Sequence, residues 1–351
     1  MALTVLSVAY PFAPVNADSV GGAEQVLYLL DQALERSGHR SIVIACEGSR
    51  PAGFHISVPR VCGHLHLAEI EATQQRHHEA ISASLARWPV DVVHLHGVDF
   101  HAYLPRGDCP ALVTLHLPVD WYPVDALAPR RPNVWFNCVS RSQQATSVPN
   151  SRMLPPIENG VATEFFAAAS VKRRFALMLA RICPEKGVHL AIEAAKRADI
   201  PLLICGDVFP YAAHQRYFKT SVKPALDRQR RFIGPVGLAR KRRLLAMASC
   251  VLIPSLAAET SSLVAREALA CGTPVIAFAR GALTETIEDG RTGFLVNDAI
   301  QMAQAITKAS KINPEVCRQS ARQRFSSAPM VQSYLSVYEL LSRRTKAQGA
   351  A

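Results

Sequence analysis

The sequence lacks several patterns that would assign the protein to a well-defined class. Its nine cysteines form no Cys-x-x-Cys pair and stand singly within apolar runs, as at Cys138, Cys205 and Cys250. Isolated cysteines in an odd number are typical of free thiols in a reducing compartment. No window reaches the roughly 18 consecutive apolar residues of a membrane helix. The first residues, MALTVLSVAYPF, have no basic segment of the kind that begins a signal peptide. We therefore expect a cytoplasmic protein, with peripheral contact at the inner face of a membrane left open.

Lysine is absent from the first part of the chain, and charge is distributed unevenly along its 351 residues. Residues 1–165 contain 11 arginines and 15 acidic residues, a net charge of −4, whereas the remainder carries +15. No helix-turn-helix, RNP or zinc pattern accompanies this basic excess, so we expect no nucleic-acid partner. A small anionic ligand or an anionic membrane surface fits better. The basic cluster 240–243 by itself is typical of a solvated helix face.

Short apolar runs alternate with helical patterns along the whole chain, as in α/β proteins with parallel sheets. The expected strands are 3–9, 41–45, 91–96, 112–116, 134–139, 175–179, 201–205, 231–234, 251–253 and 275–278, with a weak strand and turn at 55–63. The expected helices are 23–37, 67–87, one starting near 187, 240–248, 261–272 and 331–341. Prolines and Gly160 in the segment LPPIENGV indicate a domain boundary. This predicts domains at 1–160 and 161–327, followed by a helix and tail at 328–351.

Histidines do not form a metal-binding pattern in the sequence. His94 and His96 share one face of the expected strand 91–96, but no third ligand follows at a fixed spacing. His77 and His78 are adjacent and therefore face different directions on a helix. We expect no metal and no cofactor.

Two glutamates bracket the start of the helix expected at 261–272. Glu259 lies in the loop before it and Glu267 lies within it, with seven residues between them. A helix N-terminus with Ser261 and Ser262 as polar caps would offer free N–H groups to an anion, and carboxylates beside it can accept hydrogen bonds from sugar hydroxyls. From spacing alone, the more ordinary interpretation is that Glu259 is a solvated loop charge and that Glu267 lies on a solvent-exposed helix face.

These glutamates, followed by ALACGTPV, closely resemble the signature of the retaining nucleotide-sugar glycosyltransferases of family 4. The resemblance implies the GT-B fold, an α/β architecture of two Rossmann-like doubly wound domains facing across a cleft, with the last helix returning to the first domain. In this family the first Glu contacts the transferred sugar and the second holds the nucleotide ribose, which assigns these roles to Glu259 and Glu267. The family usually has Pro, an aromatic residue and Gly after the first Glu, whereas this chain has Thr260, Ser261 and Ser262.

Other positions match the family's donor site. Arg181 and Lys186 follow an expected strand as R-x-x-x-x-K, and a guanidinium with an ammonium suits a diphosphate, although each alone would be typical of a surface cation. His116 ends an expected strand, where the family's His reaches the donor sugar. The resemblance implies His116, Arg181, Lys186 and Glu259 as catalytic residues, and as donor-binding residues Gly21, Gly22, Arg181, Lys186, Gly206, Ile233, Gly234, Glu259, Ser262, Leu263, Val264 and Glu267.

The function that this resemblance implies is transfer of a hexosyl group from a UDP-, GDP- or ADP-sugar to an acceptor, with retention at the anomeric carbon. The acceptor is not identified by the sequence; a glycan, lipid-linked glycan or glycoconjugate is expected. The metal-holding pattern D-x-D is absent, so no metal requirement is expected. A sugar-nucleotide epimerase or hydrolase of the same fold, or a non-catalytic nucleotide-sugar binding protein, remains the alternative.

Overall fold

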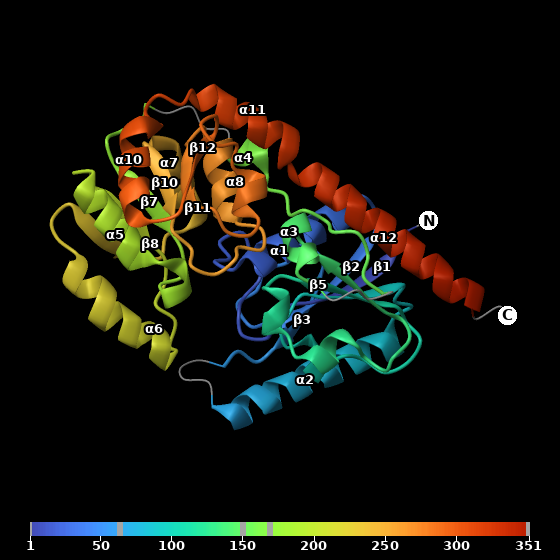
Figure 1. Cartoon of the computed structure of the whole chain (residues 1–351). Helices are drawn as coiled ribbons and strands as arrows, with labels where there is room; N and C mark the ends of the chain where they lie inside the picture. The colour runs from blue at the N-terminus through green and yellow to red at the C-terminus, as the bar shows by residue number, and fades with distance from the viewer. Residues whose placement is uncertain (1, 62–65, 148–151, 167–170, 349–351) are drawn as a thin grey trace. The chain divides into compact units, whose positions relative to one another are not determined.

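The computed structural model describes residues 2–61, 66–147, 152–166 and 171–348, with side chains described as far as residue 344. Contacts divide the chain into two units: unit 1 is Met1–Asn159 with Ala328–Ala351, and unit 2 is Gly160–Ser327. The division differs from the expected domain limits only in the assignment of Gly160. Each unit contains one six-stranded sheet (Figure 1).

The sheet of unit 1 is entirely parallel in its described pairings, with the order β3-β2-β1-β4-β5-β6. Its strands are β1 (Thr4–Val8), β2 (Arg40–Cys46), β3 (Phe54–Val58), β4 (Val92–Leu95), β5 (Ala111–Leu115) and β6 (Val134–Cys138). The helices are α1 (Gly22–Arg36), α2 (Leu67–Arg87), α3 (Arg141–Ala145) and α12 (Ser327–Gln348), the last of which begins at the final residue of unit 2. This order is that of a dinucleotide-binding fold, in which the chain reverses direction across the sheet between β1 and β4.

Unit 2 repeats the same topology, with the order β12-β11-β10-β7-β8-β9. Its strands are β7 (Ala176–Leu179), β8 (Leu202–Cys205), β9 (Arg230–Gly234), β10 (Cys250–Ile253), β11 (Val275–Phe278) and β12 (Gly293–Val296). Its helices are α4 (Thr163–Phe166), α5 (Val188–Arg197), α6 (Ala212–Tyr217), α7 (Leu238–Met247), α8 (Leu263–Ala270), α9 (Leu283–Thr286), α10 (Ala299–Ala309) and α11 (Pro314–Arg324). The described pairings are again all parallel, so β7 and β10 flank the point at which the strand order reverses.

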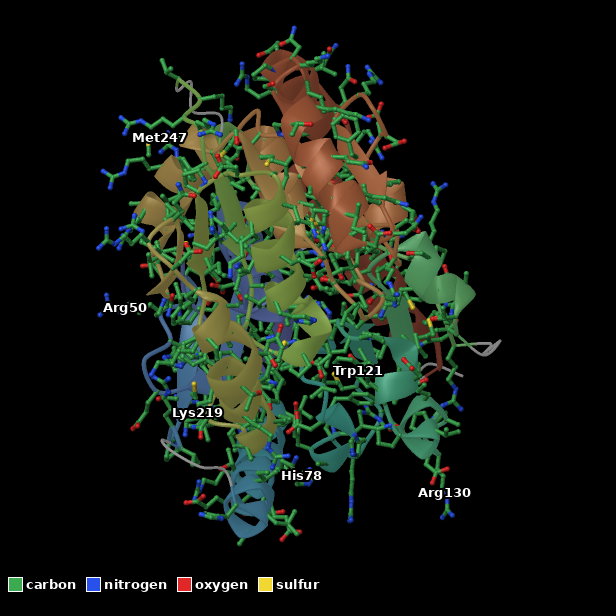
Figure 2. All side chains as sticks on the ribbon, turned by 60° about the vertical axis from the view of Figure 1, so that its left-hand side comes forward. Arg50, His78, Trp121, Arg130, Lys219 and Met247 are labelled. Carbon is green, nitrogen blue, oxygen red and sulfur yellow. The ribbon has the colours of Figure 1, made fainter. Side chains whose placement is uncertain are left out.

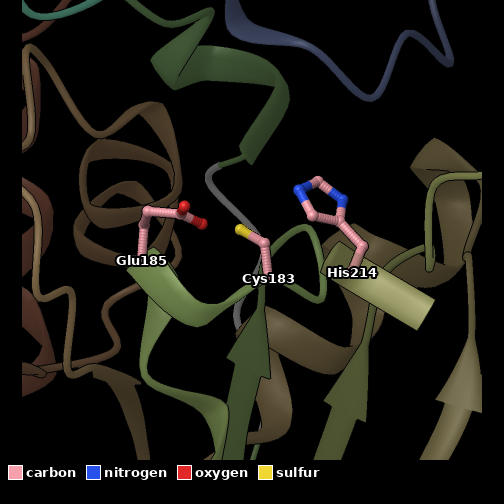
Figure 3. A group of neighbouring side chains, drawn as sticks. All are labelled: Cys183, Glu185 and His214. Carbon is pink, nitrogen blue, oxygen red and sulfur yellow. The ribbon is translucent and has the colours of Figure 1, made fainter. Parts of the chain in front are cut away.

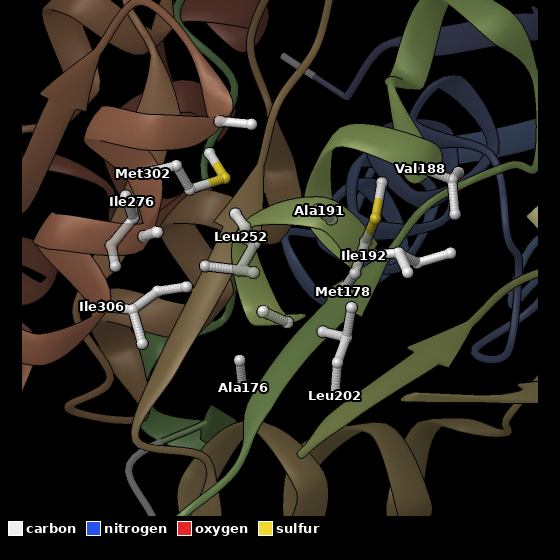
Figure 4. Packing of buried hydrophobic residues seen from close by; sticks show 14 of the residues in the cluster. Ala176, Met178, Val188, Ala191, Ile192, Leu202, Leu252, Ile276, Met302 and Ile306 are labelled. Atoms are coloured by element: carbon white, nitrogen blue, oxygen red, sulfur yellow. The ribbon is translucent and has the colours of Figure 1, made fainter. Parts of the chain in front are cut away.

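Apolar side chains on the strands of unit 2 pack against helices α5 and α10 (Figure 4). Met178, Leu252 and Ile276 come from neighbouring strands, while Ile192 lies on α5 and Met302 on α10; all five are buried. Strands covered in this way are apolar throughout rather than alternating, which explains why β7, β8, β10 and β11 were recognisable as continuous hydrophobic runs.

The structure departs from the expected elements in the last third of unit 2. The segment 288–296 contains β12, a four-residue edge strand that pairs with β11 and that was not among the expected strands. Helices α10 and α11 were not predicted. The expected strand and turn at 55–63 corresponds to β3, and its end at residues 62–63 lies outside the described residues.

Two expectations about single residues can be followed directly. His77 is buried and its Nδ1 lies 3.1 Å from the carbonyl oxygen of Thr73, whereas His78 is partly exposed, so the two do not share a face of α2. His78 is labelled in Figure 2. The eight cysteines that the structure describes are free, and all of these but Cys109 are buried. Among the described residues no helix has a stretch long and apolar enough to cross a bilayer.

Candidate functional site

The two loops that leave the carboxyl ends of β7 and β10 carry the charged residues singled out in unit 2. In doubly wound sheets, ligands bind at the carboxyl ends of the strands where the strand order reverses. The loop after β7 holds Arg181 and a short 3₁₀ helix, η4 (Pro184–Lys186), and the loop after β10 holds Glu259. The topology therefore brings these residues to one edge of the sheet, although 73 residues separate Lys186 from Glu259.

An ion pair joins the two loops. Lys186 Nζ donates to Glu259 Oε1 at 2.6 Å, and the side chains are 26% and 11% exposed. The hydroxyl of Ser255 donates to the same carboxylate oxygen. Burial alone would raise the pKa of Glu259, but Lys186, Ser255 and Arg181 lower it below its ordinary value. Glu259 is therefore ionised at neutral pH and can accept a hydrogen bond.

Backbone contacts fix the positions of these two loops relative to one another. Gly187 has φ +62°, and a Cβ at this position would lie 2.1 Å from the carbonyl oxygen of Pro254, so only glycine fits where the loops touch. The amide of Leu256 donates to the carbonyl oxygen of Glu185 at 2.7 Å. On the other side, the amide of Ala282 donates to the carbonyl oxygen of Glu259 at 2.7 Å. The Lys186–Glu259 pair thus sits on backbone that is fixed from both sides.

Arg181 lies on the same loop as Lys186. Its guanidinium carbon is 5.8 Å from the centroid of the Phe209 ring, a distance typical of a cation–π contact. The side chain is half-buried. The charges of Arg181 and Lys186 both act on Glu259, which indicates that the three side chains share one region.

The N-terminus of α8 departs from the expected capping. Ser262 occupies the N-cap position, but its side chain makes no capping hydrogen bond, because its backbone is left-handed, with φ +54° and ψ 72°. Ser261 is buried, and its Oγ has no hydrogen-bond partner among the described residues. The prediction that these serines cap the helix is therefore wrong. The left-handed conformation is the one that the family's glycine would adopt without strain.

Glu267, on α8, forms a buried ion pair. Lys241 Nζ donates to Glu267 Oε1 at 2.6 Å, and the side chains are 14% and 2% exposed. Burial raises the pKa of Glu267 even though Lys241 opposes the shift. Its second oxygen, Oε2, is buried without a hydrogen-bond partner in the described chain. Lys241 was interpreted as part of a solvated basic face, and for this residue that interpretation is wrong, because its ammonium points to a carboxylate inside the unit.

Two glycines predicted to bind the donor, Gly206 and Gly234, lie at adjacent strand ends. Gly206 follows β8 and Gly234 ends β9, and the amide of Gly206 donates to the carbonyl oxygen of Gly234 at 3.1 Å. Gly206 has φ +146°, and a Cβ there would lie 1.8 Å from the carbonyl oxygen of Ala180. Gly234 has φ +75° with open space where a Cβ would stand. Ile233 is half-buried beside the core.

Unit 1 carries the other predicted residues, likewise at the carboxyl ends of strands. Gly21 is the N-cap of α1 and Gly22 its first residue. His116 follows β5, and its Nε2 lies 3.1 Å from Nδ1 of His96, which follows β4. Burial lowers the pKa of His116 to about 3, so the imidazole is neutral. The structure describes these residues on unit 1 and the charged set on unit 2.

Behind His116 lies a buried polar network that the sequence analysis missed. His94 Nδ1 is 2.7 Å from the hydroxyl of Tyr338 on α12, and its Nε2 is 2.7 Å from Thr114 Oγ1. Thr114 also donates to Asn137 Oδ1 at 2.8 Å. The alternation of His94 and His96 was visible in the sequence, and the resemblance implied that the last helix returns to the first domain. The contact between Tyr338 on that helix and His94, 244 residues earlier, was not predicted.

Comparison with known proteins agrees with this arrangement. The family model described as glycosyl transferases group 1 matches residues 162–326, and the model described as glycosyltransferase family 4 matches residues 20–148. The chain belongs to the group 1 glycosyltransferases of family 4. The two models fall on the two Rossmann-like units in turn.

Curated relatives of this group 1 glycosyltransferase match it over limited stretches. It is 37% identical over 117 residues to a D-inositol 3-phosphate glycosyltransferase of Nocardioides sp. This match covers 33% of this chain and 24% of the relative. It is 30% identical over 148 residues to a lipopolysaccharide 1,2-N-acetylglucosaminetransferase of Salmonella typhimurium, covering 39% and 37%. These matches span less than two fifths of either relative.

Solved structures resemble the group 1 glycosyltransferase along nearly its whole length. A sucrose-phosphate synthase from Thermosynechococcus elongatus has a TM-score of 0.78 at 20% identity, covering 97% of this chain and 99% of the other. An Anabaena protein crystallised with UDP and glucose has a TM-score of 0.72 at 17% identity, covering 96% and 99%. At these identities the likeness establishes the GT-B fold.

Proposed function

We propose that the protein is a glycosyltransferase that moves a hexosyl group from a nucleoside-diphosphate sugar to an acceptor, with retention at the anomeric carbon and without a metal requirement. The acceptor belongs to glycan, lipid-linked glycan or glycoconjugate biosynthesis. The observation that carries the proposal is the Lys186–Glu259 ion pair, with Arg181 on the same loop as Lys186. The pair lies at the carboxyl ends of β7 and β10, between which the strand order of the unit 2 sheet reverses. Family membership supports the reaction class, and an Anabaena protein of the same fold is described with UDP-glucose.

In this mechanism the cationic side chains stabilise the diphosphate leaving group. As the bond from sugar to phosphate breaks, negative charge grows on the diphosphate, and preorganised positive groups stabilise it. Arg181 offers two parallel N–H donors, and Lys186 offers an ammonium that Glu259 already holds in place. The free amides at the start of α8, around Ser262, Leu263 and Val264, would add donors aimed at the same phosphates.

The carboxylates and the neutral imidazole would orient the sugar nucleotide. Both described hydrogen bonds to the Glu259 carboxylate end on Oε1, from Lys186 and Ser255, so Oε2 would accept a sugar hydroxyl. Glu267 Oε2, buried and unpartnered in the described chain, would accept from the ribose. A neutral His116 would hydrogen-bond the sugar from unit 1. No enzymic nucleophile is required, because in the family's favoured scheme the leaving phosphate takes the acceptor's proton.

The first experiment is a thermal-shift screen with UDP-, GDP- and ADP-sugars, because a ligand that binds only the folded protein raises its melting temperature. The donor that stabilises the protein is then incubated with and without candidate acceptors. A sugar-nucleotide epimerase or hydrolase would convert the donor at full rate without acceptor, and a binding protein would convert none. Retention is checked by NMR of the product, and an inverted anomer would refute it.

Two substitutions test the assignment of the charged residues. Lys186→Ala or Glu259→Gln should lower turnover at least tenfold, about 1.4 kcal/mol of transition-state stabilisation. Lys196→Ala is the matched control, because Lys196 is an exposed lysine in the last turn of α5. Unchanged transfer rates in both site variants would remove these residues from the mechanism.

A further inference from the structure

A cluster of metal-ligating side chains lies partly within the loop that carries Arg181 and Lys186, and the proposed reaction does not use it. It consists of Cys183, Glu185 and His214, whose ligand atoms all lie within 4.8 Å of one another. Cys183 precedes η4, Glu185 lies within η4, and His214 lies on α6. Figure 3 shows Glu185 and His214 on either side of Cys183, with the three side chains turned toward a shared space. Among the described residues, this is the only group of three such side chains that meets this spacing.

We propose that Cys183, Glu185 and His214 form a binding site for one Zn²⁺ ion. Zn²⁺ is held in proteins by thiolate, imidazole and carboxylate ligands at about 2.0 to 2.3 Å, commonly in tetrahedral geometry. Ligand atoms around such an ion lie roughly 3.3 to 3.8 Å apart, so the three ligand atoms need to approach one another by about 1.5 Å at most. Three protein ligands leave a fourth position for water.

The ligand types select the metal. A thiolate and an imidazole favour Zn²⁺ over Mg²⁺ or Ca²⁺, which prefer sets made only of oxygen. Cys183 as thiolate and Glu185 as carboxylate supply two negative charges to the site. Arg181, whose charge acts on both Glu185 and His214, opposes a cation, but a single positive charge does not cancel two negative ligands.

Without metal, the thiol is protonated and already interacts with its neighbours. Cys183 Sγ lies 3.7 Å from the carbonyl oxygen of Arg181 and hydrogen-bonds the side chain of Glu185. Metal binding replaces the S–H bond by a Zn–S bond, and the proton leaves to solvent. Affinity should therefore fall as pH decreases. A hydrogen-bonded thiol that binds no metal is the competing explanation.

The test is a Zn²⁺ titration of metal-free full-length protein by calorimetry, repeated with Co²⁺ as a spectroscopic probe. The wild type should bind one equivalent of Zn²⁺, and the Co²⁺ form should show a thiolate charge-transfer band. Loss of an outer partner of a metal ligand costs about 10- to 100-fold in affinity, so Cys183→Ser and His214→Ala should each weaken binding at least tenfold. Cys183→Ser should also abolish the charge-transfer band.

Cys109→Ser is the matched control, because Cys109 is a partly exposed free thiol on unit 1. It should bind like the wild type. His214→Ala replaces a partly exposed residue, so it provides a folded variant even if Cys183→Ser does not fold. Absence of Zn²⁺ binding by the wild type, or equal affinity in Cys183→Ser, would overturn the proposal. Because the proposed transfer does not use this ion, metal binding and glycosyl transfer can fail independently.

Discussion

Replacing Lys241 by methionine removes the only described partner of the Glu267 carboxylate while keeping most of the buried stem. The carboxyl is 2% exposed and its pKa is already raised by burial, with Lys241 offsetting part of the shift. Because the folded-state pKa lies above the unfolded value, the ionised form destabilises the folded protein, and the cost grows as pH rises from the unfolded pKa through the folded one. Lys241→Met should raise the folded pKa further and enlarge this cost at neutral pH.

The cost has a ceiling, because the buried carboxyl can always take a proton. Protonating a carboxyl of ordinary pKa 4.5 costs about 1.4 kcal/mol per pH unit, which is about 3.5 kcal/mol at pH 7 and about 0.7 kcal/mol at pH 5. For a unit of this size, 1 kcal/mol corresponds to about 2 to 4 °C in melting temperature. We expect Lys241→Met to melt several degrees below the wild type at pH 7 and at most about 3 °C below it at pH 5.

Differential scanning calorimetry of both proteins at the two pH values measures this difference. Introducing Lys241→Met into a Glu267→Gln background should remove its pH dependence, because no carboxyl is left to titrate. Equal loss of stability at pH 5 and pH 7 would show that the lysine contributes packing and not charge, and would refute the reasoning.

Two further predictions concern backbone geometry. Ser262 has a left-handed backbone, which costs a serine about 1 to 2 kcal/mol. Ser262→Gly removes this cost but adds about 0.5 to 1 kcal/mol of conformational entropy to the unfolded chain, so the melting temperature should stay level or rise by a few degrees. A clear decrease in melting temperature would contradict this reasoning. Gly206→Ala drives a Cβ against the carbonyl oxygen of Ala180 and should destabilise by about 2 kcal/mol or more. Gly234→Ala, at positive φ but in open space, is its control and should lose less stability in the same melts.

Much of the fold could be predicted because buried parallel strands are apolar along their whole length. Strands β7, β8, β10 and β11 are such runs, and helices α5 and α8, which follow β7 and β10, carry several buried apolar residues. The edge strand β12 has only four residues and follows a turn, so its pattern could not be separated from that turn. Helix α11 is strongly polar, and its position depends on packing against α8, which no local pattern reveals.

The site was predictable in its residue types but not in its pairings. The spacing of Arg181 and Lys186 and of the two glutamates could be read from the chain. The partner of each carboxylate could not, because Lys186 pairs with Glu259 between two loops and Lys241 pairs with Glu267 between helices α7 and α8. Lys241 stands among four consecutive basic residues, and only the packing of α7 against α8 distinguishes it from its neighbours. The same limit applies to Cys183, Glu185 and His214, whose proximity depends on the position of α6.

The chain order of the two units bears on biosynthesis. Unit 2 is one continuous stretch, whereas unit 1 needs both residues 1–159 and residues 328–351. The hydroxyls of Tyr334 and Tyr338, which meet Thr114 and His94, emerge from the ribosome only after all of unit 2 has been made. During translation, unit 2 can therefore complete its fold first, while the earlier-made unit 1 lacks the tyrosine hydroxyls beside Thr114 and His94 until α12 has been synthesised.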